Sequence, residues 1–240
     1  MAKPDKKPTE TPSDGGKNRT GLYVIGALAI AAVIAGVVFL RDGAPRDPNA
    51  PKEDPQLAAL LEAGPLEDIV LGDPNAPNVI VEYASMTCSH CANFYKNVFP
   101  EVKKKYIDTG KTRFVFREFP LDQTAAYASM LARCAGNDRF YPMIDGLFDT
   151  QEAWALPGEE GKEKLLLIAK QAGFSQASFD ECITDRDLFE KLRAVREKAY
   201  KEYGVDATPS FFVNGKRLPG IGIEHFDAAI EGSAETPPSG

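Results

Sequence analysis

The sequence predicts an α/β fold: a small sheet domain interrupted by an all-helical insert and preceded by one N-terminal transmembrane helix. Three observations lead to this prediction. An apolar run without charge or proline occupies residues 22–40. A strand pattern, a helix pattern and a second strand pattern follow one another over residues 78–119, in the order typical of a parallel βαβ unit. Residues 122–203 then show helical patterns only, before strand patterns return.

The composition fits one good-sized domain. The chain has 240 residues, 43% of them hydrophobic, and a net charge of −7. The negative charge, and the lack of a basic stripe interleaved with aromatic residues, argue against nucleic acid as a partner. The 4 cysteines do not make a disulfide-dense scaffold, so each cysteine pair needs its own explanation.

The apolar run is predicted to be an uncleaved membrane anchor over residues 21–40, because it matches the roughly 20 residues that cross a bilayer as a helix. A cleaved signal peptide is the alternative. Its apolar region is usually about 7–15 residues long, and the nearest candidate cleavage sites, after Ala44 or Ala50, are each followed by proline. A buried core helix is the other alternative.

The residues that flank the run predict its orientation. More lysines and arginines precede it (Lys3, Lys6, Lys7, Lys17, Arg19) than follow it (Arg41, Arg46, Lys52). This bias predicts a cytoplasmic disordered tail over residues 1–20 and an extracytoplasmic, periplasmic location for the rest of a single-pass inner-membrane protein. Residues 41–64 are predicted to be a spacer, rich in proline and charge over 41–55.

The sheet domain is predicted from alternating apolar segments. A short strand is possible over Leu66–Leu71, and a strong strand covers Asn78–Tyr83. Apolar residues then recur at helical spacing from Cys91 to Tyr106. Alternation returns over Lys111–Phe119 and stops at Pro120.

The insert and the end of the chain follow from the same patterns. Five helices are predicted in the insert: Asp122–Cys134, Arg139–Gln151, Glu160–Ala172, Gln176–Thr184 and Arg186–Tyr203. Beyond it, strands over Ser210–Val213 and Lys216–Leu218 flank Asn214-Gly215, a strong hairpin signal. A last helix covers about Glu224–Glu231, and residues 232–240 are a loose tail.

A Cys-x-x-Cys motif, Cys88-Ser89-His90-Cys91, lies where a strand ends and a helix begins. Residues three apart share one helical face, so the two sulfurs can form a disulfide. The free N–H groups and the dipole at the helix N-terminus stabilise a thiolate on Cys88, and His90 adds a polarisable neighbour. We expect Cys88 to exchange with substrate sulfur, Cys91 to resolve the mixed disulfide and His90 to tune the thiolate.

Two alternatives for the motif remain: half of a zinc site, or a purely structural disulfide. A zinc site usually has about four ligands, and the only other histidine of the sequence, His225, is far from the motif along the chain. A Cys-x-x-Cys motif beside a βαβ pattern favours redox chemistry. We therefore predict no metal and no cofactor.

Three segments resemble DsbA-family proteins of the periplasmic type: GDPNAPNVIVEYASMTCSHCANFY (72–95), REFPLDQTAAYASMLARC (117–134) and GVDATPSFFVNGKRLPG (204–220). The resemblance covers roughly residues 65–231. It implies a thioredoxin-like domain, 65–121 with 204–231, interrupted by the helical insert 122–203. It also implies an enzyme that oxidises cysteine pairs in exported proteins.

The resemblance extends to site residues. Cys88 matches the family's nucleophile, Cys91 its resolving cysteine and His90 its tuning histidine. Thr208-Pro209 matches a loop whose proline is cis, faces the disulfide and binds substrate through its backbone. Ser89 departs from the proline often found at this position of the family.

Two further residues complete the candidate site. The resemblance places Glu82 beneath the cysteines, where it could relay a proton to or from Cys91. The alternation in the strand leaves open whether Glu82 points inward, and an exposed strand carboxylate is the alternative. Met86, next to the motif, is predicted to belong to the surface that meets substrate.

Cys134 and Cys182 form the second cysteine pair. An extracytoplasmic location and apolar neighbours at both positions predict a structural disulfide. Some DsbA-like proteins have such a second disulfide. Two free buried thiols are the alternative.

Four functions are compatible with these features. The first is a thiol–disulfide oxidase of exported proteins that have free cysteines, reoxidised by a membrane partner resembling the quinone-linked DsbB. The second is an isomerase or reductase on the same scaffold, kept reduced by another membrane partner. The third is a chaperone or binding module without turnover, and the fourth is a metal carrier.

Overall fold

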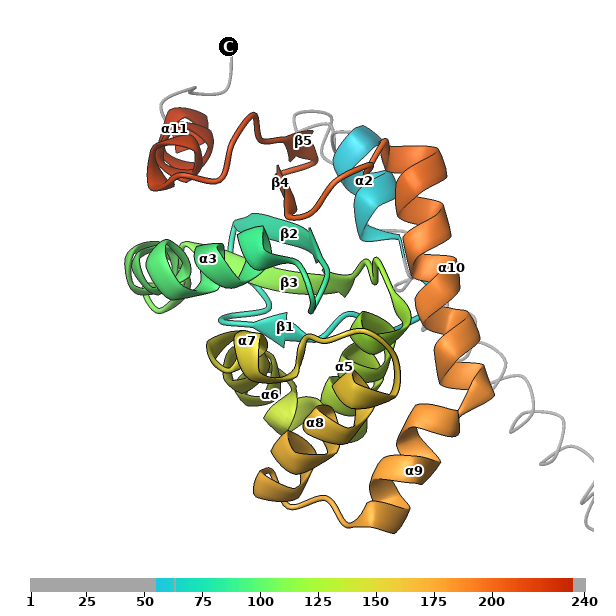
Figure 1. The fold of residues 1–240 in the computed structure, drawn as a ribbon. Coiled ribbons are helices and arrows are strands. Elements are labelled where there is room, and N and C mark those ends of the chain that lie inside the picture. Colours follow the sequence, from blue (N-terminus) through green and yellow to red (C-terminus); the bar gives the residue numbers. More distant parts are fainter. Residues whose placement is uncertain (1–54, 63, 235–240) are drawn as a thin grey trace, which may run out of the picture. The chain divides into compact units, whose positions relative to one another are not determined.

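A five-stranded mixed sheet forms the centre of the computed structural model, which describes residues 55–62 and 64–234 (Figure 1). The strand order is β1-β3-β2-β4-β5. β2 and β3 are parallel, and the other neighbours are antiparallel. The strands are β1 (Val70–Leu71), β2 (Asn78–Ala84), β3 (Thr112–Glu118), β4 (Ser210–Val213) and β5 (Lys216–Arg217). The predicted parallel pair and hairpin are confirmed.

Several sequence predictions lie outside the described residues. These are the tail 1–20, the anchor 21–40, most of the spacer and the end of the C-terminal tail. Within residues 55–62 and 64–234, none of the helices combines the length and the apolar character that a membrane crossing needs.

The helical stretch after Cys88 is divided. It consists of α3 (Ser89–Asn97), α4 (Phe99–Val102) and the π-helix η1 (Lys103–Ile107). Pro100 lies at the start of α4. Because proline has no N–H to donate, it suits the first turn of a new helix better than the interior of a continuous one. The predicted helical periodicity through Tyr106 is therefore confirmed, with a break at Val98.

The two faces of the sheet are covered by different helices. Side chains along β2 alternate between the two faces. Ile80 and Ala84 pack in one core with residues of α3 and α11 (Ile223–Ala234). Val79, Val81 and Tyr83 pack in the other core. The second core includes residues of α10 (Arg186–Tyr203) and of α2 (Pro55–Leu61). These two helices lie side by side (Figure 1), and Tyr203 donates a hydrogen bond to the Ala59 carbonyl at 2.7 Å.

This packing corrects one predicted boundary. Residues 55–61 were assigned to the spacer, but they form α2, whose Leu60 is 1% exposed because it packs against the sheet. α10 ends at Tyr203, where the insert is predicted to end, and its residues Val195 and Ala199 belong to the core of the sheet domain. The second half of α10 thus serves the sheet rather than the insert alone.

The insert helices agree with the sequence patterns. They are α5 (Gln123–Cys134), α6 (Asn137–Asp149), α7 (Gln151–Trp154), α8 (Gly158–Gln171), α9 (Gln176–Thr184) and α10. Asp122, Ser175 and Asp185 cap α5, α9 and α10 with side-chain oxygens that accept from the backbone N–H three residues on. The predicted helix Arg139–Gln151 corresponds to α6, with its last residue, Gln151, at the start of the short helix α7.

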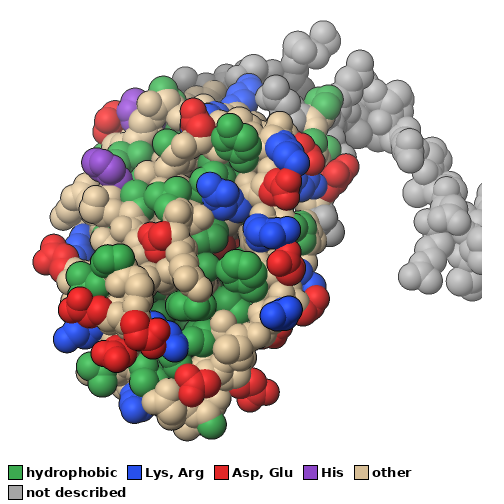
Figure 2. Space-filling view, turned by 45° about the vertical axis from the view of Figure 1, so that its right-hand side comes forward, with side chains coloured by type: hydrophobic (Ala, Val, Ile, Leu, Met, Phe, Trp, Pro, Cys, Tyr) green, Lys and Arg blue, Asp and Glu red, His purple; other side chains and the backbone are tan. Residues whose placement is uncertain are grey.

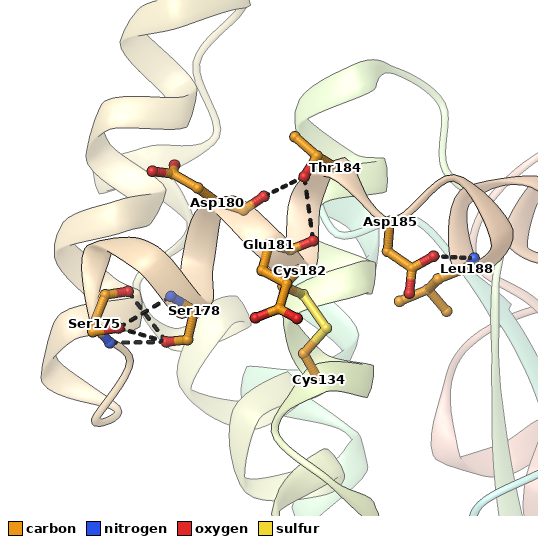
Figure 3. Close-up of a disulfide and its surroundings, with 9 residues drawn as sticks. All are labelled: Cys134, Ser175, Ser178, Asp180, Glu181, Cys182, Thr184, Asp185 and Leu188. Carbon is orange, nitrogen blue, oxygen red and sulfur yellow. Dashed lines mark hydrogen bonds between the residues drawn. A yellow bond between two sulfur atoms is a disulfide. The ribbon is translucent and has the colours of Figure 1, made fainter.

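A disulfide joins Cys134 at the end of α5 to Cys182 in α9, as predicted (Figure 3). Their Cα atoms are 6.2 Å apart. Cys182 is buried beside Met130 and Leu192, whereas Cys134 is exposed. The apolar surroundings expected for both sulfurs are found for Cys182 only, because Cys134 lies at the last turn of its helix.

The surface carries charges of both signs. Figure 2 shows Lys and Arg side chains intermingled with Asp and Glu across one face, with apolar side chains between them. This face offers no continuous basic track of the kind that a nucleic-acid backbone requires.

Candidate active site

The Cys-x-x-Cys motif lies at the start of α3, directly after a turn that follows β2. The Cys88 N–H donates to the Ser85 carbonyl at 3.1 Å, and the Cys88 carbonyl accepts from the Ala92 N–H at 3.1 Å. Cys88 is the N-cap of α3, with an extended backbone and no side-chain cap of the usual kind. Its sulfur therefore lies at the end of the helix where N–H groups are free.

The two sulfurs have very different surroundings. Cys88 is partly exposed, whereas Cys91 is 0% exposed and packs among the core residues of its face. The Cys91 thiol lowers the pKa of Cys88 to about 5 by donating to its sulfur, and the N–H groups of Cys91 and His90 add to this effect against the opposing effect of burial. Burial raises the pKa of Cys91 far above its ordinary value, and the hydrogen bond to Cys88 and the charges of Glu82 and Cys88 add to this effect.

His90 acts on Cys88 through its backbone. Its N–H contributes to the low pKa of the Cys88 thiol. Its side chain is exposed, and no hydrogen bond or ion pair joins it to another residue of the described ranges. A tuning role of the imidazole itself stays a prediction.

The Thr208-Pro209 loop faces the active-site sulfur. The peptide bond between these residues is cis, as the resemblance implied. In its thiol form Cys88 donates to the Thr208 carbonyl oxygen at 3.3 Å. The buried Thr208 hydroxyl has no hydrogen-bond partner among protein groups of the described residues.

Glu82 points inward, which the sequence pattern left open. It is 0% exposed and lies on the face of β2 that α3 covers, together with Ile80 and Ala84. Burial raises the pKa of its carboxyl well above 4.5, and the charge of Cys88 adds to this, while the Tyr95 hydroxyl opposes it. The charge of Glu82 thus interacts with both cysteines, and the Tyr95 hydroxyl interacts with its carboxyl group.

Met86 does not belong to the substrate-facing surface. Its side chain is 0% exposed and packs in the core that contains Cys91. The prediction that Met86 meets substrate is therefore wrong for this conformation, because no part of the side chain reaches the surface.

Three residues of the site were missed by sequence analysis. Tyr95 is 6% exposed and faces Glu82, and only its place one helical turn beyond Cys91 hinted at this. Asp122 accepts a hydrogen bond from the Thr87 hydroxyl; its N-cap position was recognisable, but not this contact. Gln151, more than sixty residues away, donates to the Cys88 carbonyl, and no local signal predicts that.

Two hollows are lined by residues near the motif, one by the cis-proline loop and one by Thr87. One, of about 440 Å³, lies along the cis-proline loop; its lining includes Pro209, Phe211, Leu218, Pro219 and Ile221. The other, also of about 440 Å³, adjoins Thr87; its lining includes Asp122, Thr124, Leu156 and Pro157.

Metal ligands are not assembled around the motif. In residues 55–62 and 64–234, no group of three or more His, Cys, Asp and Glu side chains is arranged to hold a metal ion. His225 lies instead near Gly220 and Glu224.

Comparison with known proteins gives a consistent picture. The family model described as thioredoxin matches residues 66–232. A Rickettsia bellii protein named as a protein-disulfide oxidoreductase is 37% identical over 169 residues, 70% of this chain and 65% of that protein. A Rickettsia felis protein of the same name is 31% identical over 191 residues, covering 78% and 68%. This chain thus spans about two thirds of the length of these relatives.

A solved structure is also similar. The crystal structure of alpha-DsbA1 from Wolbachia pipientis superposes with a TM-score of 0.65 at 34% sequence identity. The match covers 72% of this chain and 94% of that one.

Proposed function

Because this chain belongs to the thioredoxin family, we propose that it is a DsbA-like thiol–disulfide oxidoreductase that oxidises cysteine pairs in exported proteins. The observation that carries the proposal is the contrast between its two sulfurs. The outer one, Cys88, is partly exposed with a pKa of about 5, and the inner one, Cys91, is buried with a raised pKa.

The proposed reaction starts from the Cys88–Cys91 disulfide. A substrate thiolate attacks the sulfur of Cys88, a mixed disulfide forms, and the electron pair of the broken bond goes to Cys91. Cys91 needs a proton, because its pKa is raised, and the buried carboxyl of Glu82 can supply it. A second substrate thiolate then attacks the substrate sulfur and releases Cys88 as a stable thiolate. Two electrons pass from the substrate to the cysteine pair.

The substrate is a polypeptide with free cysteines. The cis-proline loop beside Cys88 has the backbone groups to pair with an extended segment. The adjoining hollow is lined by both apolar side chains, such as Phe211 and Leu218, and polar ones, such as Arg217. A thiolate with a low pKa favours the reduced form of the enzyme and therefore makes its disulfide a strong oxidant. This favours oxidase over isomerase or reductase activity.

A redox equilibrium with glutathione tests the direction. An oxidase should show a reduction potential near −120 mV, and a reductase one near −270 mV. Oxidation of a peptide with two cysteines should proceed with the wild type and stop in Cys88→Ser. Equal behaviour of the two proteins would overturn the proposal and favour a binding module.

We also propose where this enzyme works. The apolar run 22–40, with more cations before it than after it, supports a single-pass anchor in the inner membrane with the catalytic domain in the periplasm. A DsbB-like, quinone-linked oxidase in the same membrane would then reoxidise the pair. A C-terminal reporter that is active only outside the cytoplasm, in fusions with and without residues 1–41, tests the location. Activity that does not depend on these residues would contradict it.

A further inference from the structure

The helical insert holds the active-site loop at three consecutive residues. Gln151, the first residue of α7, donates from Nε2 to the Met86 carbonyl at 2.8 Å and to the Cys88 carbonyl at 3.0 Å. Asp122, the N-cap of α5, accepts from the Thr87 hydroxyl at 2.5 Å. The loop that carries Cys88 is thus bonded to an element far away in sequence.

The Gln151 side chain is buried and hydrogen-bonded to the active-site loop. Its side chain is 5% exposed, so its amide has left water and must find partners in the protein. Its donors face two carbonyls of the active-site loop, on either side of Thr87. Packing alone would be served as well by an apolar side chain of the same length, such as methionine.

The bond to the Cys88 carbonyl matters for the chemistry. This carbonyl also accepts a hydrogen bond from the Ala92 N–H. Its orientation therefore determines the backbone geometry of the first turn of α3. The start of α3 in turn aims the N–H groups of His90 and Cys91 at the Cys88 sulfur. A turn of this peptide group would break its bond to the Ala92 N–H and loosen the first turn of α3, to which those donors belong.

We propose that Gln151 is a positioning residue for the redox reaction: it holds the backbone of residues 86–88 so that the N-terminus of α3 faces the Cys88 sulfur. The inference rests on the proposed thiol–disulfide function. According to this proposal the insert takes part in the redox reaction, because removing one of its side chains raises the pKa of the Cys88 thiol.

The test compares Gln151→Met with wild type. Methionine keeps the length and lack of branching while removing both donors. The matched control is Gln176→Met: Gln176 also opens an insert helix and donates to two oxygens, both on Asp180, but on the exposed surface of α9. The readouts are the thiolate absorbance of reduced protein against pH and the redox equilibrium with glutathione, with Tm as a check on folding.

We expect the thiolate midpoint of Gln151→Met to rise by about one pH unit and the redox equilibrium to move about tenfold toward the disulfide form. Gln176→Met should match the wild type in both. A folded Gln151→Met with wild-type midpoint and equilibrium would overturn the proposal.

A second variant decides the question if Gln151→Met does not fold. In Gln151→Glu a protonated carboxyl keeps one donor and a carboxylate keeps none, so the thiolate midpoint should lie above the wild-type value. A wild-type midpoint there would overturn the proposal equally. The proposed function fails in a different way: wild-type Cys88 would itself ionise near 8.5, or Cys88→Ser would still oxidise the peptide.

Discussion

The sulfur of Cys88 lies 3.3 Å from the carbonyl oxygen of Thr208, the residue that precedes the cis proline. The two residues are 120 positions apart in sequence. Their contact places the reactive sulfur beside backbone groups that can hydrogen-bond to an extended substrate segment. The mixed disulfide and the backbone pairing with substrate therefore form at the same site.

The different burial of the two sulfurs predicts the outcome of single substitutions. In Cys91→Ser the thiolate of the partly exposed Cys88 can attack a peptide that contains a disulfide, bond to one peptide sulfur and release the other as a thiolate, and no sulfur inside the protein can then displace the bound peptide. We therefore expect Cys91→Ser to accumulate mixed disulfides that dithiothreitol releases, and Cys88→Ser to accumulate none. Mass spectrometry under non-reducing conditions measures both. Mixed disulfides through Cys91 in Cys88→Ser would contradict the assignment of the outer sulfur.

The low pKa of Cys88 predicts the pH dependence of the reduction potential. Below about pH 5 the reduced pair binds two protons, and above it only the one on Cys91. For this two-electron couple the potential should fall by about 59 mV per pH unit in the first range and about 30 mV in the second. Glutathione or a dithiol buffer of known potential measures it. A single slope of about 59 mV up to pH 8 would show that Cys88 has an ordinary pKa.

The same pKa predicts how the stability of the reduced protein depends on pH. The folded-state pKa, about 5, is below the ordinary value of 9.0, so the stabilisation is complete above 9.0 and is lost as pH falls through about 5. The Tm of reduced wild type, relative to reduced Cys88→Ser, should therefore increase between pH 5 and 9. A constant difference over this range would exclude a stabilised thiolate.

Glu82 is predicted to favour reaction at the expense of stability. Its folded-state pKa is raised, so its contribution to stability is present below 4.5 and is lost as pH rises through the folded value. Glu82→Gln removes the titration, and we expect its Tm to gain on the wild type as pH rises above 4.5.

In the same variant the attack of a substrate thiolate on the Cys88–Cys91 disulfide should slow by about a hundredfold, because Cys91 must then leave without the proton that Glu82 supplies. Rapid-mixing kinetics with a peptide substrate measure this step. An unchanged rate together with the gain in Tm would leave Glu82 a buried carboxyl without a part in the reaction.

The disulfide between Cys134 and Cys182 is predicted to stabilise the insert without taking part in turnover. It closes a sequence separation of 48 residues. Replacing both cysteines by serine should lower the free energy of unfolding by about 4 kcal/mol on the chain-entropy model. Denaturant unfolding measures this, and the peptide-oxidation rate should be unchanged. A double variant with normal stability but no activity would mean that the redox pair has been misassigned.

Local signals in the sequence determined most of the secondary structure. Asp122 and Ser175 have side chains that cap a helix, and Asn214-Gly215 takes the left-handed backbone of a hairpin turn, with φ of 49° and 82°. Such preferences act between near neighbours, so they are visible in a short window. For the same reason the place of Cys88 at the first turn of a helix could be predicted.

Only the tertiary structure decided which distant groups meet. The inward direction of Glu82 depends on which face of β2 is covered by α3. The helix α2 belongs to the core because Leu60 packs against an apolar surface of the sheet. The bonds from Gln151 to the active-site loop join residues more than sixty positions apart. These outcomes depend on burial and on the satisfaction of polar groups across the whole fold, and a local pattern does not encode either.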